Sequence, residues 1–93
     1  MKLYLAVLEV VDQEQNKAYK AEHNEYVDKK VEENKIAFCG PFLDGSGGAI
    51  VYIADSYEEA YSLASSDPLV SNHARSLKLQ EWGMKKKNDP FAK

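Results

Sequence analysis

The chain is poor in cysteine, proline and glycine. Among its 93 residues there are one cysteine, three prolines and five glycines. The single thiol, Cys39, excludes an internal disulfide and a four-cysteine zinc site. A chain of this length buries only about 60 to 65% of its unfolded surface, and small domains commonly gain stability from an added element. We expect that element to be a second subunit.

Long apolar runs and a strong charge imbalance are also missing. No apolar run approaches the roughly 18 to 20 residues that span a membrane. Residues 1–8 are apolar apart from Lys2. Glu9 interrupts this run and no small-residue cleavage site follows, so a buried strand explains these residues better than a signal peptide. A formal net charge of -3, with both signs interleaved, offers no positive field to nucleic acid. We expect a cytoplasmic protein that binds neither membranes nor nucleic acid.

The first half of the chain predicts a strand, a helix and a strand. Residues 3–11 are apolar on both faces, which indicates a buried strand. The polar residues 12–16 can cap a long amphipathic helix that ends near Asn34. A short strand is expected over residues 36–40. The inner face of the helix is expected to carry Tyr19, His23, Tyr26, Val27, Lys30 and Val31.

The second half repeats this order after a loop at residues 41–48. A strand is expected over residues 49–54, and Ser56 with Glu59 predicts a capping box at the start of a helix. Pro68 should end this helix, with one further helical turn possible as far as residue 72. The last strand, residues 76–84, has mixed polarity that suits the edge of a sheet.

This order predicts an α+β fold of the ferredoxin-like βαββαβ type. Such a fold has a four-stranded antiparallel sheet with two helices on one face. Residues 3–11 and 49–54 are nevertheless apolar on both faces, which would expose a large apolar patch on a monomer. We therefore expect a homodimer in which two sheets stack face to face as a dimeric α+β barrel.

His23 and Asp67 are the residues with the clearest chemical potential. A histidine on the inner face of a helix needs partners for its ring nitrogens. In one interpretation His23 binds a main-chain carbonyl and Asp67 only caps the turn that begins at Pro68. In the other, the carboxylate of Asp67 also accepts from His23, orients the imidazole and stabilises its protonated form for proton transfer. The residues alone leave both interpretations open.

Three short segments resemble, in the same order, the YCII-related (YciI-like) family. They are residues 21–27 (AEHNEYV), 40–42 (GPF) and 66–70 (SDPLV). The resemblance runs from Met1 to about Met84. It implies one ferredoxin-like domain over residues 1–84, followed by a basic polar tail over residues 85–93.

The resemblance also implies a site. The family has a His and Asp pair that faces a pocket and is proposed as a catalytic dyad, which corresponds to His23 and Asp67 here. The turn at Gly40 and Pro41 borders that pocket in the family. One relative is a dehydrochlorinase of chlorinated hydroxylated aromatics, and the similar muconolactone isomerase barrels move protons on lactones, so neither a cofactor nor a metal is implied.

Two hypotheses of function follow. The first is a cofactor-free enzyme, a lyase or an isomerase, in which His23 and Asp67 perform general acid–base chemistry on a small organic molecule. The second is a non-catalytic ligand-binding or assembly module in which the same pair holds the two helices together.

Other features favour structural interpretations. Residues 45–48 lack the spacing of a phosphate-binding loop and predict a hairpin turn. Cys39 is expected to be a small buried core residue, and His73 to be exposed or at a subunit contact. Trp82 and Phe91 are candidates for a subunit contact.

Overall fold

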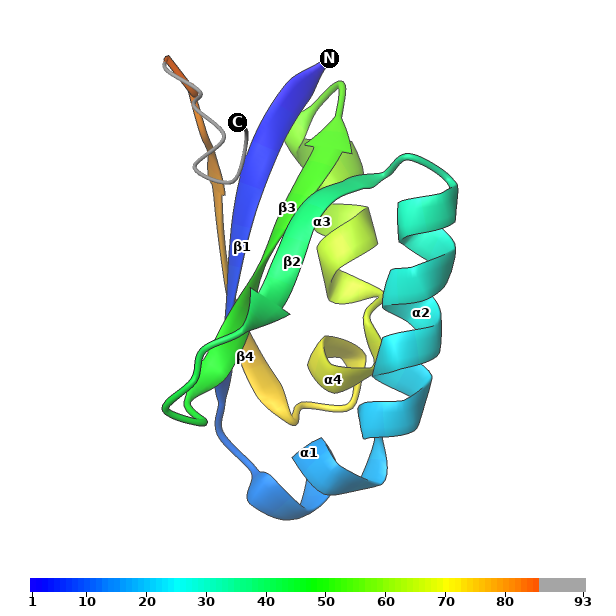
Figure 1. Cartoon of the computed structure of the whole chain (residues 1–93), viewed down its shortest axis with the longest axis vertical. Coiled ribbons are helices and arrows are strands. Elements are labelled where there is room, and N and C mark those ends of the chain that lie inside the picture. The colour runs from blue at the N-terminus through cyan, green and yellow to red at the C-terminus, as the bar shows by residue number, and fades with distance from the viewer. Residues whose placement is uncertain (86–93) are drawn as a thin grey trace, which may run out of the picture.

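The computed structural model describes residues 1–85 and confirms the ferredoxin-like prediction. Its antiparallel sheet contains β1 (Lys2–Val10), β2 (Ile36–Pro41), β3 (Gly47–Ala54) and β4 (Arg75–Glu81), in the order β2-β3-β1-β4. One side of the sheet carries α1 (Gln13–Ala18), α2 (Lys20–Glu32), α3 (Tyr57–Ser65) and α4 (Pro68–Ser71) (Figure 1). None of these helices is long and apolar enough to cross a membrane. The tail predicted over residues 85–93, apart from Lys85, lies outside the described residues, as does Phe91.

The long first helix expected from the sequence is present as α2, but the structure adds a short helix, α1, over the residues that were expected to cap it, and separates the two at Tyr19. Asp12 caps α1 by accepting a hydrogen bond from the amide of Gln15 at 3.1 Å. Tyr19 then leaves helical geometry, with φ −107° and ψ 11°. The break turns α1 across the end of the sheet, where Asn16 accepts a hydrogen bond from Nε of Arg75 at 2.8 Å. A continuous helix would not make this contact with β4.

The core lies between the sheet and the helices. Tyr52 and Ala6 occupy the inner face of the two central strands and are fully buried. Small side chains of α3, Ala60 and Ala64, let this helix approach the sheet closely. By contrast, α2 contributes no fully buried residue, and Val31, which was expected on its inner face, is 46% exposed. The contact of α2 with the rest of the molecule therefore depends on its half-buried side chains.

The two ends of α3 form largely as predicted. The side-chain oxygen of Ser56 accepts a hydrogen bond from the amide of Glu59 at 3.2 Å. The carboxylate of Glu59 reaches back to the amide of Asp55 at 2.7 Å, one residue earlier than in a standard capping box. At the other end, α3 stops at Ser65, and Pro68 starts α4 in the position where a proline is best tolerated.

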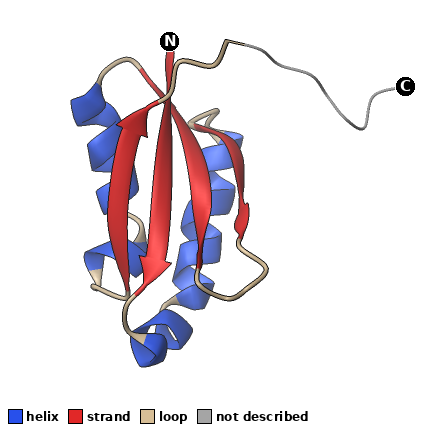
Figure 2. Ribbon diagram, turned by 90° about the vertical axis from the view of Figure 1, so that its left-hand side faces the viewer, coloured by secondary structure: helices blue, strands red, loops and turns tan. Residues whose placement is uncertain are grey.

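Within residues 1–85 no helix lies on the opposite face of the sheet, as Figure 2 shows. Strand alternation places Leu5 and Val51 on this face, paired across β1 and β3. Phe38 of β2 pairs with Val51 on the same face and is 64% exposed. The predicted apolar character of both faces is therefore present in the folded chain, and β4 lies at an edge as expected.

Candidate functional site

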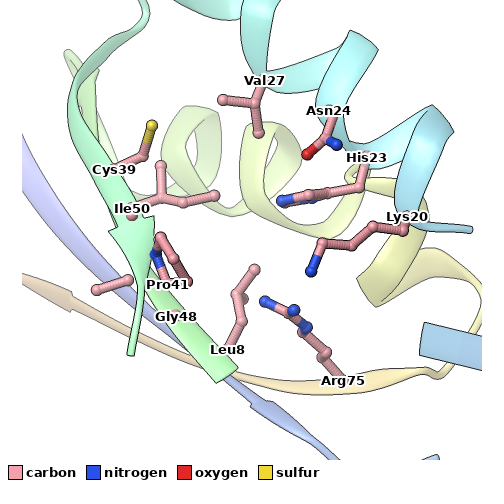
Figure 3. A pocket seen from close by; sticks show the side chains of 12 residues that line it. Leu8, Lys20, His23, Asn24, Val27, Cys39, Pro41, Gly48, Ile50 and Arg75 are labelled. Atoms are coloured by element: carbon pink, nitrogen blue, oxygen red, sulfur yellow. The ribbon is translucent and has the colours of Figure 1, made fainter. Parts of the chain in front are cut away.

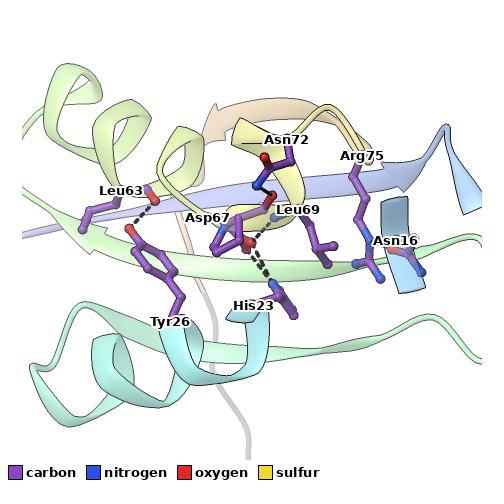
Figure 4. A network of polar contacts seen from close by, with 9 residues as sticks. Asn16, His23, Tyr26, Leu63, Asp67, Leu69, Asn72 and Arg75 are labelled. Atoms are coloured by element: carbon purple, nitrogen blue, oxygen red, sulfur yellow. Dashed lines mark hydrogen bonds and ion pairs between the residues drawn. The ribbon is translucent and has the colours of Figure 1, made fainter. Parts of the chain in front are cut away.

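The structure brings His23 and Asp67 into contact, although they are 44 residues apart in the chain. Nδ1 of His23 lies 2.8 Å from each oxygen of the Asp67 carboxylate (Figure 4). The Asp67 side chain is completely buried, while 14% of the His23 side chain is exposed. The carboxylate is therefore sealed behind the ring, and only the histidine reaches solvent-accessible space.

Local sequence explains how each partner is positioned. His23 lies on the face of α2 that is turned toward α4 and the sheet, one helical turn after Tyr19. Asp67 takes an extended conformation between α3 and α4, and its Oδ1 accepts a hydrogen bond from the amide of Leu69 at 2.9 Å. Asp67 thus caps α4 and binds His23 with the same carboxylate. These contacts match the second interpretation, in which Asp67 caps α4 and also accepts from His23, whereas within residues 1–85 the His23 ring binds no main-chain carbonyl.

This geometry determines which ring nitrogen serves the cavity. An ionised carboxylate only accepts hydrogen bonds, so when the Asp67 side chain is ionised, Nδ1 of His23 carries the hydrogen that the two groups share. Within residues 1–85, Nε2 makes no hydrogen bond to the protein. In the neutral ring Nε2 is therefore an acceptor, the form that a general base requires.

His23 lines a cavity of about 330 Å³, within the range of small-molecule sites. Figure 3 shows its ring directed into this space. Gly40 and Pro41, predicted to border the pocket, do line it. The remaining lining residues are Leu8, Lys20, Asn24, Val27, Cys39, Gly48, Ala49, Ile50 and Arg75.

Cys39 corrects one prediction. It was expected in the core, but it is exposed and lines the cavity. The side chain does point to the helix side, since Cys39 pairs with the inward-facing Ile50, but the helices leave a hollow above this edge strand. His73 is exposed, as expected, has φ 60° and lies outside the cavity lining. No cluster of three or more His, Cys, Asp or Glu side chains within residues 1–85 is arranged to hold a metal ion.

Lys20 and Arg75 are cavity residues that the sequence reasoning missed. Lys20 precedes His23 by three positions, which places both on one face of α2. Arg75 alternates with Leu77 and Leu79 along β4, so its side chain shares their inward face. Both periodicities were present in the sequence and would have identified these two residues.

Two tyrosines adjoin the buried carboxylate. Tyr26 donates a hydrogen bond to the carbonyl oxygen of Leu63 at 2.7 Å, which ties α2 to α3. Burial raises the pKa of Tyr26, and the nearby charge of Asp67 acts in the same direction. Burial also raises the pKa of Tyr52, again with a contribution from Asp67. The hydroxyl of Tyr52 is a buried group that has no hydrogen-bond partner among residues 1–85.

Comparisons with known proteins give consistent results. The model of the YCII-related domain family matches residues 3–83. The uncharacterized protein YjpA of Bacillus subtilis (strain 168) is 41% identical over 71 residues, which are 76% of this chain and 84% of that protein. The structure of 5-chloro-2-hydroxyhydroquinone dehydrochlorinase (TftG) from Burkholderia phenoliruptrix AC1100, in complex with 2,5-dihydroxybenzoquinone, superposes with a TM-score of 0.77. At 22% identity over 94% of this chain and 99% of that one, the likeness concerns the fold.

Proposed function

The chain belongs to the YCII-related domain family, and from that premise we propose that it is an enzyme in which His23 performs general acid–base catalysis on a small organic molecule. Asp67 acts as the positioning residue. The observation that carries this proposal is the pairing of Nδ1 with a fully buried carboxylate, while the His23 ring faces a cavity. Elimination and isomerisation are the reaction types that this arrangement suits, because both require only proton transfer.

In an elimination, neutral Nε2 of His23 removes a proton from a carbon atom of the substrate. The electrons of that C–H bond form a double bond to the neighbouring carbon, and the leaving group departs from it with its bonding pair. Asp67 stabilises the imidazolium that results, and solvent then takes the proton. In an isomerisation the imidazolium returns the proton to a different atom of the same molecule.

The fold relationship suggests which compounds to test first. TftG is a dehydrochlorinase, and its structure holds 2,5-dihydroxybenzoquinone. Chlorinated hydroxylated aromatics and unsaturated lactones therefore form the first screening set. Chloride release is the readout for the chlorinated aromatics, and transfer of a carbon-bound proton, followed by NMR, is the readout for the lactones.

The variant His23→Gln tests the role of the ring. Loss of a general base typically lowers the rate by about 10²- to 10⁴-fold, so we expect at least a hundredfold loss of turnover. His73→Gln is the matched control, because His73 is exposed and lies outside the cavity. It should retain the rate of the native chain. Turnover that survives in His23→Gln, with the melting temperature unchanged, would exclude the proposed role.

A structural role for the pair is the second candidate, favoured by the complete burial of Asp67 and its bond to the amide of Leu69. In this case the protein is a ligand-binding or assembly module, and His23 holds α2 to the segment before α4. His23→Gln would then lower stability and leave ligand binding unchanged. Measuring both quantities on one variant separates the two candidates.

We further propose that the chain forms a homodimer through the sheet face that carries no helix. The support is its apolar content: Phe38 is 64% exposed and Leu5 is half-buried, while Val51, which pairs with both, is already buried in the single chain. Apolar surface of this kind on a small domain marks an interaction site. A second copy of the same face is the commonest partner, because it forms a closed two-fold assembly.

Sedimentation of the variant Phe38→Glu tests the dimer. A charge at this exposed position should leave the monomer folded but place two carboxylates in the interface, so the protein should sediment as a monomer. Leu43→Glu is the control, because Leu43 is fully exposed in the turn between β2 and β3. The native chain sedimenting as a monomer at micromolar concentration would contradict the proposal.

A further inference from the structure

The charges around the cavity are of one sign. Lys20 and Arg75 are its cationic lining residues, and no carboxylate stands among the lining residues. The one carboxylate nearby, Asp67, is screened from the cavity by the ring of His23. A ligand in the cavity therefore meets two positive charges directly and the negative charge only through the imidazole.

Arg75 is buried more deeply than an arginine usually is. Only 7% of the residue is exposed. Within residues 1–85 it forms no ion pair, and its hydrogen-bond partner is the neutral side chain of Asn16, which accepts from Nε. A buried guanidinium normally requires a charged or strongly polar partner. The two terminal nitrogens, Nη1 and Nη2, are left for the cavity.

The surroundings of Arg75 support this view. Burial lowers the pKa of the guanidinium, and the charge of Asp67 opposes that effect. Arg75 stays protonated in any case, because arginine side chains do not lose their proton in proteins. Figure 3 shows the nitrogen ends of Lys20 and Arg75 directed toward the space enclosed by the lining residues. The planar guanidinium of Arg75 and the ammonium group of Lys20 beside it are suited to bind a planar anion.

We propose that Arg75 and Lys20 form a carboxylate-binding subsite, so that the substrate class of this cavity is small organic acids. The inference rests on the proposed function, because it assigns the ring of His23 and the carboxylate-binding subsite to the same substrate. The terminal nitrogens of Arg75 bind the two carboxylate oxygens, and Lys20 adds a second positive charge.

The apolar lining indicates where the rest of the acid lies. Leu8 and Ile50 form the floor of the cavity on the sheet, and Val27 lies opposite on α2. A carboxylate held at Arg75 directs its carbon skeleton along this apolar surface and past the ring of His23. The reacting carbon is then the substrate carbon that lies next to Nε2 of His23. Its position is fixed by the contact of the substrate carboxylate with Arg75.

Binding of benzoate, compared with benzamide, tests the subsite. The two molecules have nearly the same shape and differ in charge, and NMR titration of the backbone amides of cavity residues measures both affinities without turnover. A hydrogen bond to a charged group contributes about 1.5 to 3 kcal/mol, so benzoate should bind at least about tenfold more tightly than benzamide. Added salt should reduce that difference.

Variants assign the effect to residues. Arg75→Met should abolish most of the preference for benzoate, and Lys20→Gln should reduce it severalfold. Lys17→Gln is the matched control, because it removes an exposed positive charge outside the cavity lining and should keep the full preference for benzoate. If Arg75→Met does not fold, Lys20→Gln and the salt dependence of the native chain provide the same comparison, since Lys20 lines the cavity but is itself exposed.

Equal affinities for benzoate and benzamide, or no change in cavity resonances at millimolar benzoate, would overturn the subsite. The same follows if folded Arg75→Met or Lys20→Gln keeps the full preference. Binding by His23→Gln separates the two proposals. A preference for benzoate that persists in this variant supports the subsite, whatever turnover measurements show about His23.

Discussion

Replacing Asp67 by asparagine and by alanine separates the two bonds that its carboxylate makes. In the native chain the carboxylate accepts from the amide of Leu69 at 2.9 Å and from Nδ1 of His23 at 2.8 Å. Asparagine keeps an acceptor oxygen for Leu69 but turns an amide NH₂ group toward the ring. Alanine removes both acceptors.

The structure sets the size of each effect. Loss of an N-cap destabilises a protein by about 1 kcal/mol, and a buried polar group left without its partner adds about 1 to 3 kcal/mol. Asp67→Ala should therefore lower the free energy of unfolding by about 2 to 4 kcal/mol. Asparagine caps helices as well as aspartate does, so Asp67→Asn should lose only about 1 kcal/mol.

Asp67→Asn should also change the tautomer of His23. With the amide oxygen held at the Oδ1 position by Leu69, the NH₂ group replaces Oδ2, 2.8 Å from Nδ1. There it can donate to a bare Nδ1 but would face a hydrogen on it, so the ring hydrogen should move to Nε2. The nitrogen that faces the cavity then becomes a donor in the neutral ring and no longer serves as a base. The variant should remain folded and lose general-base activity.

Two measurements check this prediction. Urea unfolding gives the stability of each variant, and the ¹⁵N shifts of the ring nitrogens distinguish the two tautomers directly. The resonances of His23 are assigned by comparison with His73→Gln. The reasoning is refuted if Asp67→Asn leaves the hydrogen on Nδ1, or if asparagine is as destabilising as alanine.

Three further changes test separate parts of the fold by urea unfolding. Tyr52→Phe removes a buried hydroxyl that lacks a partner within residues 1–85, so stability should rise by about 1 kcal/mol at neutral pH. Burial raises the pKa of Tyr52 above its ordinary value of 10. The folded native chain therefore keeps its full stability below pH 10, where the tyrosine is protonated in both states, and loses about 1.4 kcal/mol per pH unit above pH 10, where only the unfolded chain releases the proton. The stability difference in favour of Tyr52→Phe should therefore widen above pH 10. Gly47→Ala should cost about 3 kcal/mol or more, since Gly47 has φ +153° and a Cβ would lie 1.9 Å from the carbonyl oxygen of Leu8, whereas Gly83→Ala, with open space around it, should be neutral. Ser56→Ala should cost about 1 kcal/mol through the lost cap of α3, and an unchanged midpoint would show that this cap is dispensable.

Much of the fold could be predicted because local signals and global topology agree. Strand alternation along β1 and β3 predicted apolar residues on both faces, and the structure buries Tyr52 and Ala6 on the helix side and leaves apolar residues on the opposite face. Asp67 before Pro68 identified both the end of α3 and the cap of α4. The contact of Asp67 with His23 also agrees with the sequence reasoning, while the catalytic role of the pair stays a prediction.

The sequence-based predictions fail at positions where tertiary packing determines the local structure. Nothing in local propensity marks Tyr19 as a break, and the division into α1 and α2 reflects the contact of Asn16 with Arg75 on β4. Cys39 was misjudged because its inward direction was taken to mean burial, whereas the helices do not fill the space above β2 at that point. Sequence periodicity gives the direction of a side chain, and only the packed structure shows what meets it.

The chain supplies the site from two widely separated stretches. Lys20 and His23 come from the segment after β1, whereas Asp67 and Arg75 come from the last third of the chain. In the sheet the strands of the two halves interleave, because β1 lies between β3 and β4. Neither half can therefore carry the cavity by itself. Ligand affinity should appear only in the final step of folding. The rate at which ligand binding returns after dilution from denaturant therefore measures the rate at which the complete native state forms.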